Sequence, residues 1–169
     1  MTEKPFDELL AEAQHSALKL ELRDAYLLTD PAFEDWQADR PLSEVAAHYA
    51  EWSAIARRTV ARGVDLRRVR VVSDPPSDYI RFEHAVTDAV NTSAGERIRW
   101  LARSKAGALV LPANDFWLID DRLVMWLYFS GDGDLTGSAT TDDPAVVKVC
   151  KDSFATAWEA GGEATDLGL

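Results

Sequence analysis

Polar residues that could do chemistry gather in one stretch, LPANDFWLIDDRLV, at residues 111–124. Asn114 and Asp115 precede an apolar run, and the acidic pair Asp120 and Asp121 follows it. Two adjacent carboxylates could act as acid and base in catalysis, but a tight turn between two strands accounts for the pair more simply. The stretch therefore supplies candidate site residues where strands begin and end, and binding residues are often carried at such places.

His84 is the histidine whose sequence surroundings best suit a site, because Arg81 and Glu83 lie close to it. Its predicted helix begins where a strand ends, and ligands of open α/β sheets bind at that edge. His84 could therefore act as a base together with Asp115 or Asp120. A partly exposed histidine on a capped helix is the simpler interpretation, and both stay open.

A polar ligand pocket is the alternative to a catalytic site, and its residues would come from the helix after residue 77 and the strands around the acidic pair. The candidate pocket residues are Tyr79, Arg81, His84, Asn114, Asp115, Trp117, Asp120 and Arg122. The polar edge of this pocket comprises Arg81, His84, Asn114 and Asp115. Side chains of these types would orient a small ligand by hydrogen bonds and charge.

Motifs for metals and cofactors are missing from the sequence. No two histidines stand at metal-ligand spacing, and the single cysteine, Cys150, cannot build a structural zinc site. The stretch Asp132-Gly133-Asp134 lacks the spacing and terminal glutamate of a calcium-binding loop. Phosphate-binding glycine loops, dinucleotide motifs and the serine-hydrolase elbow are also absent. We therefore expect no metal and no cofactor.

Hydrophobic periodicity and turn signals place the elements that must position these residues. Apolar runs on both sides of the acidic pair predict a β-hairpin, and Ser43 and Gly63 mark the ends of one amphipathic helix. Strands or extended segments are predicted at residues 18–28, 64–72, 97–103, 116–119 and 123–129. Helices are predicted at residues 6–10, 31–38, 43–62, 79–90 and 144–160. Residues 131–134 are predicted to form a loop, and residues 161–169 a frayed tail.

The chain is strongly acidic: its 169 residues include 18 basic and 29 acidic side chains, which gives a formal net charge of −11. This length suits one domain with a sizeable core. Direct nucleic-acid binding is not expected of so acidic a chain, because such binding depends on neutralising phosphates. Basic groups exceed acidic ones only in residues 66–112. That middle part is either a set of solvated strand and helix edges or a face that contacts anions.

Cysteine usage and the N-terminal sequence bear on the compartment. One cysteine cannot form an internal disulfide, which suits a reducing setting. Charged residues run through MTEKPFDELLAEAQ, which lacks the apolar core of a signal peptide. No stretch approaches the ~20 apolar residues needed to cross a bilayer. We therefore expect a cytoplasmic protein that does not bind membranes.

The order strand, helix, strand, hairpin, helix over residues 60–160 resembles one half of the phospholipase D-like fold. An apolar strand with an acidic turn at 117–121, a second strand, a Gly/Ser loop and a helix with Phe154 and Trp158 carry this resemblance. The pattern is similar to degenerate phospholipase D-like sensor domains attached to some winged-helix regulators. The resemblance implies an α/β (α+β) fold, a single layered domain with a mixed sheet, flanking helices and an N-terminal helical extension.

The chain as a whole resembles an actinobacterial family of about 170 residues, a domain of unknown function often encoded beside small helix-turn-helix regulators. The segments that carry this resemblance are ARGVDLRRVRVVSDPPSDYIRFEHAV, AGERIRWLAR, LPANDFWLIDDRLV and TDDPAVV. The expected division is an N-terminal extension at 1–42 that packs on the core, a phospholipase D-like core at 43–160, and the tail at 161–169.

The fold resemblance permits one test for catalysis. Active phospholipase D-like enzymes carry His-x-Lys and, after four further residues, Asp; the histidine attacks phosphorus and the lysine neutralises phosphate charge. Aligning the motif aspartate with Asp120 puts Ala113 at the histidine position and Asp115 at the lysine position. The next register puts Asn114 and Phe116 there. Neither register has a nucleophile or a cation, so we expect no phosphodiesterase activity.

The sequence therefore favours a non-catalytic regulatory or ligand-sensing domain that acts with a separate helix-turn-helix transcriptional regulator. An enzyme of unfamiliar chemistry on a small anionic substrate and a pure protein-interaction module are the alternatives. The expected partners are the helix-turn-helix protein and a small-molecule ligand, and a homodimer stays open.

Overall fold

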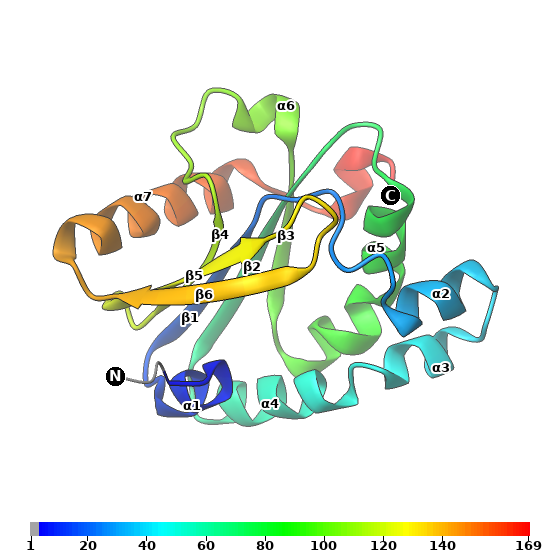
Figure 1. The fold of residues 1–169 in the computed structure, drawn as a ribbon, viewed down its shortest axis with the longest axis horizontal. Coiled ribbons are helices and arrows are strands. Elements are labelled where there is room, and N and C mark those ends of the chain that lie inside the picture. The colour runs from blue at the N-terminus through cyan, green and yellow to red at the C-terminus, as the bar shows by residue number, and fades with distance from the viewer. Residues whose placement is uncertain (1–3) are drawn as a thin grey trace.

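The computed structural model describes residues 4–169, which form a six-stranded mixed sheet flanked by helices (Figure 1). The strand order is β3-β2-β1-β4-β5-β6. The strands are β1 (Ser16–Glu21), β2 (Asp65–Val72), β3 (Arg97–Ala102), β4 (Asp115–Ile119), β5 (Leu123–Phe129) and β6 (Leu135–Thr141). β1, β2 and β3 are parallel, whereas β4 pairs antiparallel with both β1 and β5, and β5 pairs antiparallel with β6. β1 is thus the interior strand where the parallel half meets the antiparallel half.

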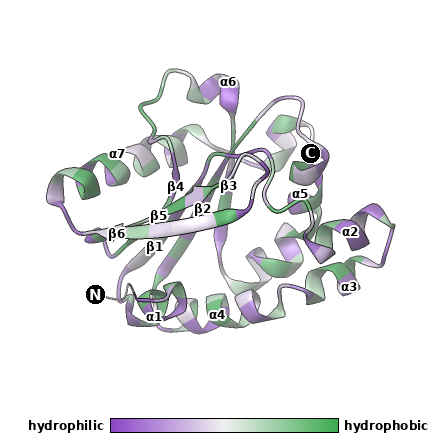
Figure 2. Ribbon diagram, viewed as in Figure 1, coloured by the Kyte–Doolittle hydropathy of each residue, from purple (hydrophilic) through white to green (hydrophobic). Residues whose placement is uncertain are grey.

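Helices cover both faces of this sheet (Figure 1). The α-helices are α1 (Phe6–Glu12), α2 (Pro31–Gln37), α3 (Leu42–Ala47), α4 (Ala50–Ala61), α5 (Asp78–Val90), α6 (Arg103–Ala106) and α7 (Pro144–Ala160). α7 packs on one face, and α1, α4 and α5 pack on the other. Hydrophobic and hydrophilic residues alternate along α4 and α7, as expected of helices that bury one side against a sheet (Figure 2).

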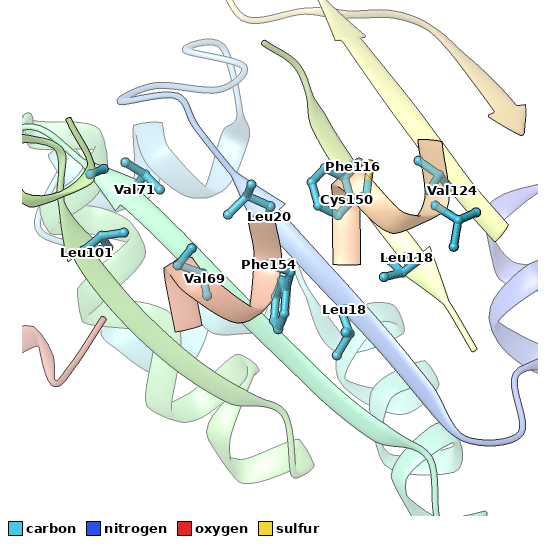
Figure 3. Packing of buried hydrophobic residues seen from close by; sticks show 13 residues of the cluster. Leu18, Leu20, Val69, Val71, Leu101, Phe116, Leu118, Val124, Cys150 and Phe154 are labelled. Carbon is cyan, nitrogen blue, oxygen red and sulfur yellow. The ribbon is translucent and has the colours of Figure 1, made fainter. Parts of the chain in front are cut away.

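The face beneath α7 is an apolar core. Successive side chains of a strand point to opposite faces, so Leu18 and Leu20 of β1 lie on the same side as Val69 and Val71 of β2. These four side chains pack in one cluster with Phe154 of α7 (Figure 3). Burial of each such side chain contributes about 1.5–3 kcal/mol to folding, so this face stabilises the fold.

The opposite face changes character along the strands. Near the start of β1 and β2, Ala17 and Leu66 pack against Leu10 of α1 and Ala56 of α4 in a second apolar cluster. Further along the same face, the side chains at alternate positions are charged. The sheet therefore has one uniformly apolar face and one face that is partly apolar and partly charged.

The structure confirms the predicted fold class, a mixed α+β domain with helices flanking a mixed sheet. The predicted hairpin is β4–β5, and its turn holds Asp120 and Asp121 at φ 52° and 53°. Aspartate tolerates this left-handed conformation better than most residues. α5 begins at Asp78, one residue before the predicted start at Tyr79, and the Ser77 hydroxyl accepts a hydrogen bond from the Ile80 amide at 3.2 Å.

The single helix predicted at 43–62 is wrong, because the chain forms α3 and α4 with a break at His48 and Tyr49. α3 begins after Pro41, and Ser43 lies within it. At Tyr49 the backbone leaves helical geometry, and the Tyr49 hydroxyl donates a 2.5 Å hydrogen bond to Asp30 at the start of α2. A tertiary contact thus interrupts a sequence whose apolar period continues across the break.

Three further segments differ from their predictions. Residues 135–141 form the edge strand β6, which had no strand signal because its sequence, LTGSATT, is rich in small polar residues. The predicted tail is ordered on β3: Gly162 exchanges two backbone hydrogen bonds of 2.9 Å with Trp100, and Ala164 is buried. Residues 16–21, placed in an N-terminal extension, form the interior strand β1.

None of the helices formed by residues 4–169 is both long and apolar enough to cross a membrane.

Candidate functional site

A cavity of about 380 Å³ lies between the charged part of the sheet and helices α4 and α5. Its aromatic lining residues are Phe6, Tyr26, Tyr49, Trp52, Tyr79, Phe82 and Trp117. Its polar lining residues are Asp30, Arg68, Arg70, Glu83 and Asn91. A volume in this range and an apolar wall with a few polar groups are typical of sites for small organic molecules.

The aromatic walls are held by ring contacts between segments far apart in the sequence. Trp52 of α4 lies 5.8 Å from Trp117 of β4, measured between ring centroids, and Phe6 of α1 lies 4.7 Å from the same ring. On the opposite wall, Tyr79 and Phe82 of α5 meet edge to face at 5.4 Å. Such aromatic pairs favour fixed relative orientations, so the cavity is formed without a ligand.

Charged side chains form the sheet side of the cavity and the layer behind it. We call the following residues the buried charge cluster: Lys19, Glu21, Arg68, Arg70, Glu83, Glu96 and Asp115. Strand pairing sets Lys19 beside Arg68. The same register sets Glu21 beside Arg70. Charges at this depth are rare unless they are paired, so the partners of each one matter.

Glu21 forms ion pairs with two arginines of the cluster. It accepts a 2.5 Å hydrogen bond from Arg68 Nη1 and a 3.0 Å hydrogen bond from Arg70 Nε. Burial alone would raise the pKa of Glu21, but Arg68, Arg70 and Lys19 outweigh burial and hold that pKa at about 2. Glu21 is therefore ionised near neutral pH.

Glu96 anchors the opposite end of the cluster and is 1% exposed. Its carboxylate accepts hydrogen bonds from Arg68 Nε at 2.7 Å, from Asn91 Nδ2 at 2.6 Å and from Trp52 Nε1 at 3.2 Å. The last two donors belong to cavity-lining residues. Glu96 thus holds in place the side chains of Trp52, Asn91 and Arg68, which line the cavity.

Glu83 on α5 is a carboxylate of the cluster with an oxygen that accepts no hydrogen bond. Its residue is 9% exposed, and its Oε2 atom is buried without a hydrogen-bond donor. The nearest cation, Arg70 Nε, lies 3.8 Å away and already donates to Glu21. Burial, opposed in part by Arg70 and reinforced by Glu21, raises the pKa of Glu83 to about 7.

Lys19 and Asp115 lie behind the cavity on neighbouring strands. Burial lowers the pKa of Lys19 to about 8, and its ammonium lies 5.2 Å from the centre of the Trp117 ring. Asp115 accepts hydrogen bonds from the Leu22 amide at 2.9 Å and from the Tyr26 hydroxyl. Burial also raises the pKa of Asp115, although Lys19 acts against that change.

Two tyrosines at the cavity are tied to carboxylates. Tyr26 donates to Asp115, and Tyr49 donates to Asp30, whose other oxygen caps α2 through a 2.9 Å hydrogen bond from Ala32. Burial and these carboxylates raise the pKa of both phenols above its usual value. Both hydroxyls therefore stay protonated and keep their rings in place on the wall.

The structure brings three of the residues predicted from sequence to this region. Tyr79 and Trp117 line the cavity, and Asp115 lies behind it as the partner of Tyr26. Their common location follows from the packing of α5 against the sheet, where Thr87 accepts a hydrogen bond from Arg70 of β2 and Ile80 packs with Val72, a contact that the sequence could not specify.

The other predicted site residues lie elsewhere. Arg81 and Asn114 are exposed and do not line the cavity. The His84 ring packs edge to face on Trp100 of β3, with 5.8 Å between centroids, in a separate surface depression. Arg122 borders another depression beside α1.

Asp120 has a structural role in the hairpin turn. Its carboxylate accepts hydrogen bonds from the backbone amides of Gln14, His15 and Ser16, at 2.7 Å for His15 and 3.0 Å for Ser16. These donors outweigh burial and lower the pKa of Asp120 below its usual value.

Arg81, His84, Asn114 and Asp115, expected to form one polar edge, therefore do not lie together in one site.

Sequence reasoning missed the residues that make up the polar part of the cavity, chiefly Arg68, Arg70 and Glu83. A signal was present: in LKLEL and DLRRVRVV, charged residues alternate with apolar ones inside strands that turn out to be interior. Alternation is usually a sign of a solvated face. Only the helices packed over that face show that the charges are buried.

Within residues 4–169, no group of three or more His, Cys, Asp or Glu side chains is arranged to hold a metal ion. The free cysteine Cys150 is buried in the core beneath α7, where burial raises the pKa of its thiol to about 11. A thiol in that state is a poor nucleophile.

Comparison with solved structures shows what this fold resembles. The chain is similar to a phospholipase D family member, Nuc from Salmonella typhimurium, with a TM-score of 0.52 and 10% identity over 92% of this chain and 86% of that chain. It is also similar to TrmBL2, described as an archaeal chromatin protein with a novel mode of DNA binding, with a TM-score of 0.52 and 14% identity. That match covers 92% of this chain but 47% of TrmBL2, so this chain spans about half of that protein.

These likenesses show the phospholipase D-like fold and nothing further, since the identities are low. No curated protein matches this sequence. A family match extends over residues 4–166, nearly the whole chain. The chain belongs to the family described as Domain of unknown function (DUF6879).

Proposed function

We propose that this chain is a non-catalytic, cytoplasmic ligand-sensing domain that acts with a separate helix-turn-helix transcriptional regulator. The observation that carries the proposal is the preformed cavity of about 380 Å³ with its aromatic walls and few polar groups. Its size and lining suit a small organic ligand.

The position of the cavity supports a sensing role. Its walls come from α1, the segment before α2, α4, α5, β2 and β4, which are brought together only by the tertiary fold. A ligand that contacts all of them would stabilise one arrangement of these segments over others. Leu27 at the rim is also bonded to the β5–β6 loop, through a 3.2 Å hydrogen bond from its amide to Gly133. Ligand contact could thus be relayed to the exposed β6 edge.

The geometry around the motif positions supports a non-catalytic role. Asp115, at the position of the phosphodiesterase lysine, is a buried carboxylate bonded to Tyr26 and Leu22. The alternative dyad of His84 and Asp115 is not assembled, because His84 packs on β3 whereas Asp115 belongs to β4. Three strand spacings separate β3 from β4, about 14 Å in all.

The charge of the chain supports action through a second protein. A net charge of −11 opposes direct contact with nucleic acid, and the resemblance to a family encoded beside helix-turn-helix regulators supplies a partner of the required kind. TrmBL2 shows that this fold occurs in a DNA-associated protein. The single cysteine, buried and unpaired, suits the reducing cytoplasm.

The test compares two neighbouring leucines at the surface. Leu27 borders the cavity and Leu28 does not, yet both are exposed, at 41% and 51%. The Leu27→Trp variant should obstruct the cavity, whereas Leu28→Trp should leave it open. We expect the wild-type chain and Leu28→Trp, purified from the native host, to retain the same small molecule in native mass spectrometry, and Leu27→Trp to lose it.

The regulatory part of the proposal is tested with the same variants. In the presence of the wild-type chain or Leu28→Trp, addition of the ligand should change the affinity of the helix-turn-helix partner for its operator. In the presence of Leu27→Trp, addition of the ligand should leave that affinity unchanged. A ligand retained equally by all three proteins would overturn the assignment of the cavity. A ligand that leaves operator binding unchanged would overturn the regulatory role.

A further inference from the structure

One carboxylate oxygen of Glu83 accepts no hydrogen bond, although Arg70 Nε lies 3.8 Å from it. Its Oε2 atom is buried, accepts no hydrogen bond and belongs to a residue that lines the cavity. A buried acceptor of this kind costs about 1–3 kcal/mol, and more when it is charged. A ligand donor placed in the cavity would remove that cost.

The charges around Glu83 indicate which sign of charge a ligand group beside it should have. The buried charge cluster has three cations, Lys19, Arg68 and Arg70, and four carboxylates, Glu21, Glu83, Glu96 and Asp115. When all are ionised, one negative charge is in excess. The arginine donors are directed at protein acceptors, since Arg68 bonds to Glu21 and Glu96 and Arg70 bonds to Glu21 and Thr87.

The walls of the cavity suit a positively charged ligand. Aromatic faces attract cations through their quadrupole, and Tyr79 and Phe82 stand on the same helix as Glu83, within one turn of it. A second carboxylate, Asp30, lines the cavity. An apolar body would pack between the rings while a charged nitrogen reached Glu83.

We propose that the cavity binds a small organic cation, an amine with an aromatic or aliphatic body, whose ammonium group donates to Oε2 of Glu83. This inference rests on the ligand-binding function proposed above and names the chemical class of the ligand. Because the ammonium neutralises the excess charge of the cluster, a neutral molecule of the same shape binds more weakly. A carboxylate of the same shape is repelled by Glu83 and Asp30.

Binding of the cation is linked to proton release. The groups that face Glu83 are Arg68 and Arg70 of β2, Glu21 of β1, Asp115 of β4 and the phenols of Tyr26, Tyr49 and Tyr79. Of these, Glu21 is ionised, the arginines stay charged and the phenols stay neutral near pH 7. Burial raises the pKa of Glu83 to about 7, so an arriving ammonium displaces the proton that this carboxyl holds there.

The test uses three probes of similar shape: 2-phenylethylamine, 2-phenylethanol and phenylacetate. Isothermal titration calorimetry with the full chain at pH 7 should show the amine binding about tenfold or more tightly than the alcohol, with phenylacetate weakest. Glu83→Gln should reduce the affinity for the amine to that for the alcohol and leave the alcohol unchanged. Asp88→Asn, an exposed acid on the same helix outside the cavity, is the control and should change neither affinity.

A second measurement keeps the proposal falsifiable if Glu83→Gln does not fold. Titration of the wild-type chain in two buffers of different ionisation enthalpy at pH 7 should show proton release with the amine and not with the alcohol. Equal affinities for amine and alcohol, or binding of the amine without proton release, would overturn the assignment of a cation and leave the cavity as a neutral ligand site. Absence of binding by all three probes would count against the cavity itself.

Discussion

At the scale of single residues, the unusual feature is that a row of charges is buried where the strand pattern suggests a solvated face. Glu21 and Glu96 accept hydrogen bonds from arginines at 2.5–3.0 Å, whereas Glu83 Oε2 accepts none and has its nearest arginine nitrogen 3.8 Å away. Buried pairs of this kind contribute little net stability but are costly to break. Carboxylates with a strongly raised pKa in a cavity are candidates for functional sites, and for this reason the proposed ligand site is centred on Glu83.

The pH dependence of stability should report Glu83 directly. Its pKa in the folded protein, about 7, lies above the ordinary value of 4.5, so folding favours the protonated carboxyl. That stabilisation is complete below pH 4.5 and is lost as the pH rises through 7, by about 3 kcal/mol at most. Urea unfolding should therefore show Glu83→Gln gaining stability relative to wild type between pH 4.5 and 8.

Asp88→Asn is again the control, since Asp88 is exposed on the same helix. Its stability difference from wild type should be constant over this pH range. A constant difference for Glu83→Gln as well would mean that Glu83 titrates normally in the folded protein.

Asp120 and Asp121 in the hairpin turn should contribute unequally to the free energy of unfolding. Both have positive φ, which glycine adopts without strain, but Asp120 accepts hydrogen bonds from three backbone amides whereas Asp121 forms a 2.6 Å ion pair with Lys151 at the surface. Asp120→Gly should lower the free energy of unfolding by about 2 kcal/mol, and Asp121→Gly by about 0.5 kcal/mol or less. Chemical denaturation measures both, and equal losses would contradict the structural role of Asp120.

At the scale of elements, the C-terminal segment is part of the fold. Gly162 pairs with Trp100 of β3, and Ala164 is buried against the same edge. Ala164→Asp should therefore destabilise the protein by about 2–3 kcal/mol, because a carboxylate would be forced into an apolar contact. The exposed neighbour Thr165 gives the matched variant, Thr165→Asp, which should change stability by about 0.5 kcal/mol or less. Similar melting temperatures for the two variants would indicate that the segment is frayed in solution.

The break between α3 and α4 interrupts a helix and places Tyr49 at the cavity. A continuous helix would carry the Tyr49 side chain around with the helical turn, but the break lets its hydroxyl reach Asp30 and its ring line the cavity. The bond also joins the start of α2 to the start of α4. The segments that border the cavity are thus connected to one another as well as to the sheet.

At the scale of the whole molecule, the distribution of charge bears on partners. Six of the eight basic side chains in residues 66–112 form internal contacts: Arg67, Arg68, Arg70, Arg97, Arg99 and Arg103 each bond or pair within the chain. Arg67, Arg97 and Arg99 also surround the Trp158 ring, with guanidinium-to-centroid distances of 5.0, 5.8 and 4.5 Å. Most basic side chains of this part are therefore engaged in contacts within the fold.

Direct binding to DNA should accordingly be weak. In an electrophoretic mobility assay at physiological salt, we expect the isolated chain to leave duplex DNA unshifted at micromolar concentration, because its net charge is −11 and Arg68 and Arg70 are paired with buried carboxylates. The mixture with the helix-turn-helix partner should shift operator DNA. A shift by the chain alone that Arg97→Glu abolishes would show that the β3 edge contacts phosphates after all.

The sequence by itself determined the local structure and the class of fold. Helices α5 and α7, strand β2 and the hairpin around Asp120 are set by residues close in the chain, so they could be predicted. The same local information failed at β6, whose small polar residues pair only because β5 offers an edge, and at Tyr49, whose bond to Asp30 breaks a helix.

Only the tertiary structure decided where the site is. Whether Arg68, Arg70 and Glu83 face bulk water or a cavity depends on the packing of α4 and α5 against the sheet, a contact between segments that periodicity treats independently. The candidate residues Tyr79 and Trp117 meet there, whereas Arg81, His84 and Asn114 do not. Residue types can be chosen for their chemistry from sequence, but burial and partnership are properties of the packed chain, and in this protein those two properties single out Glu83.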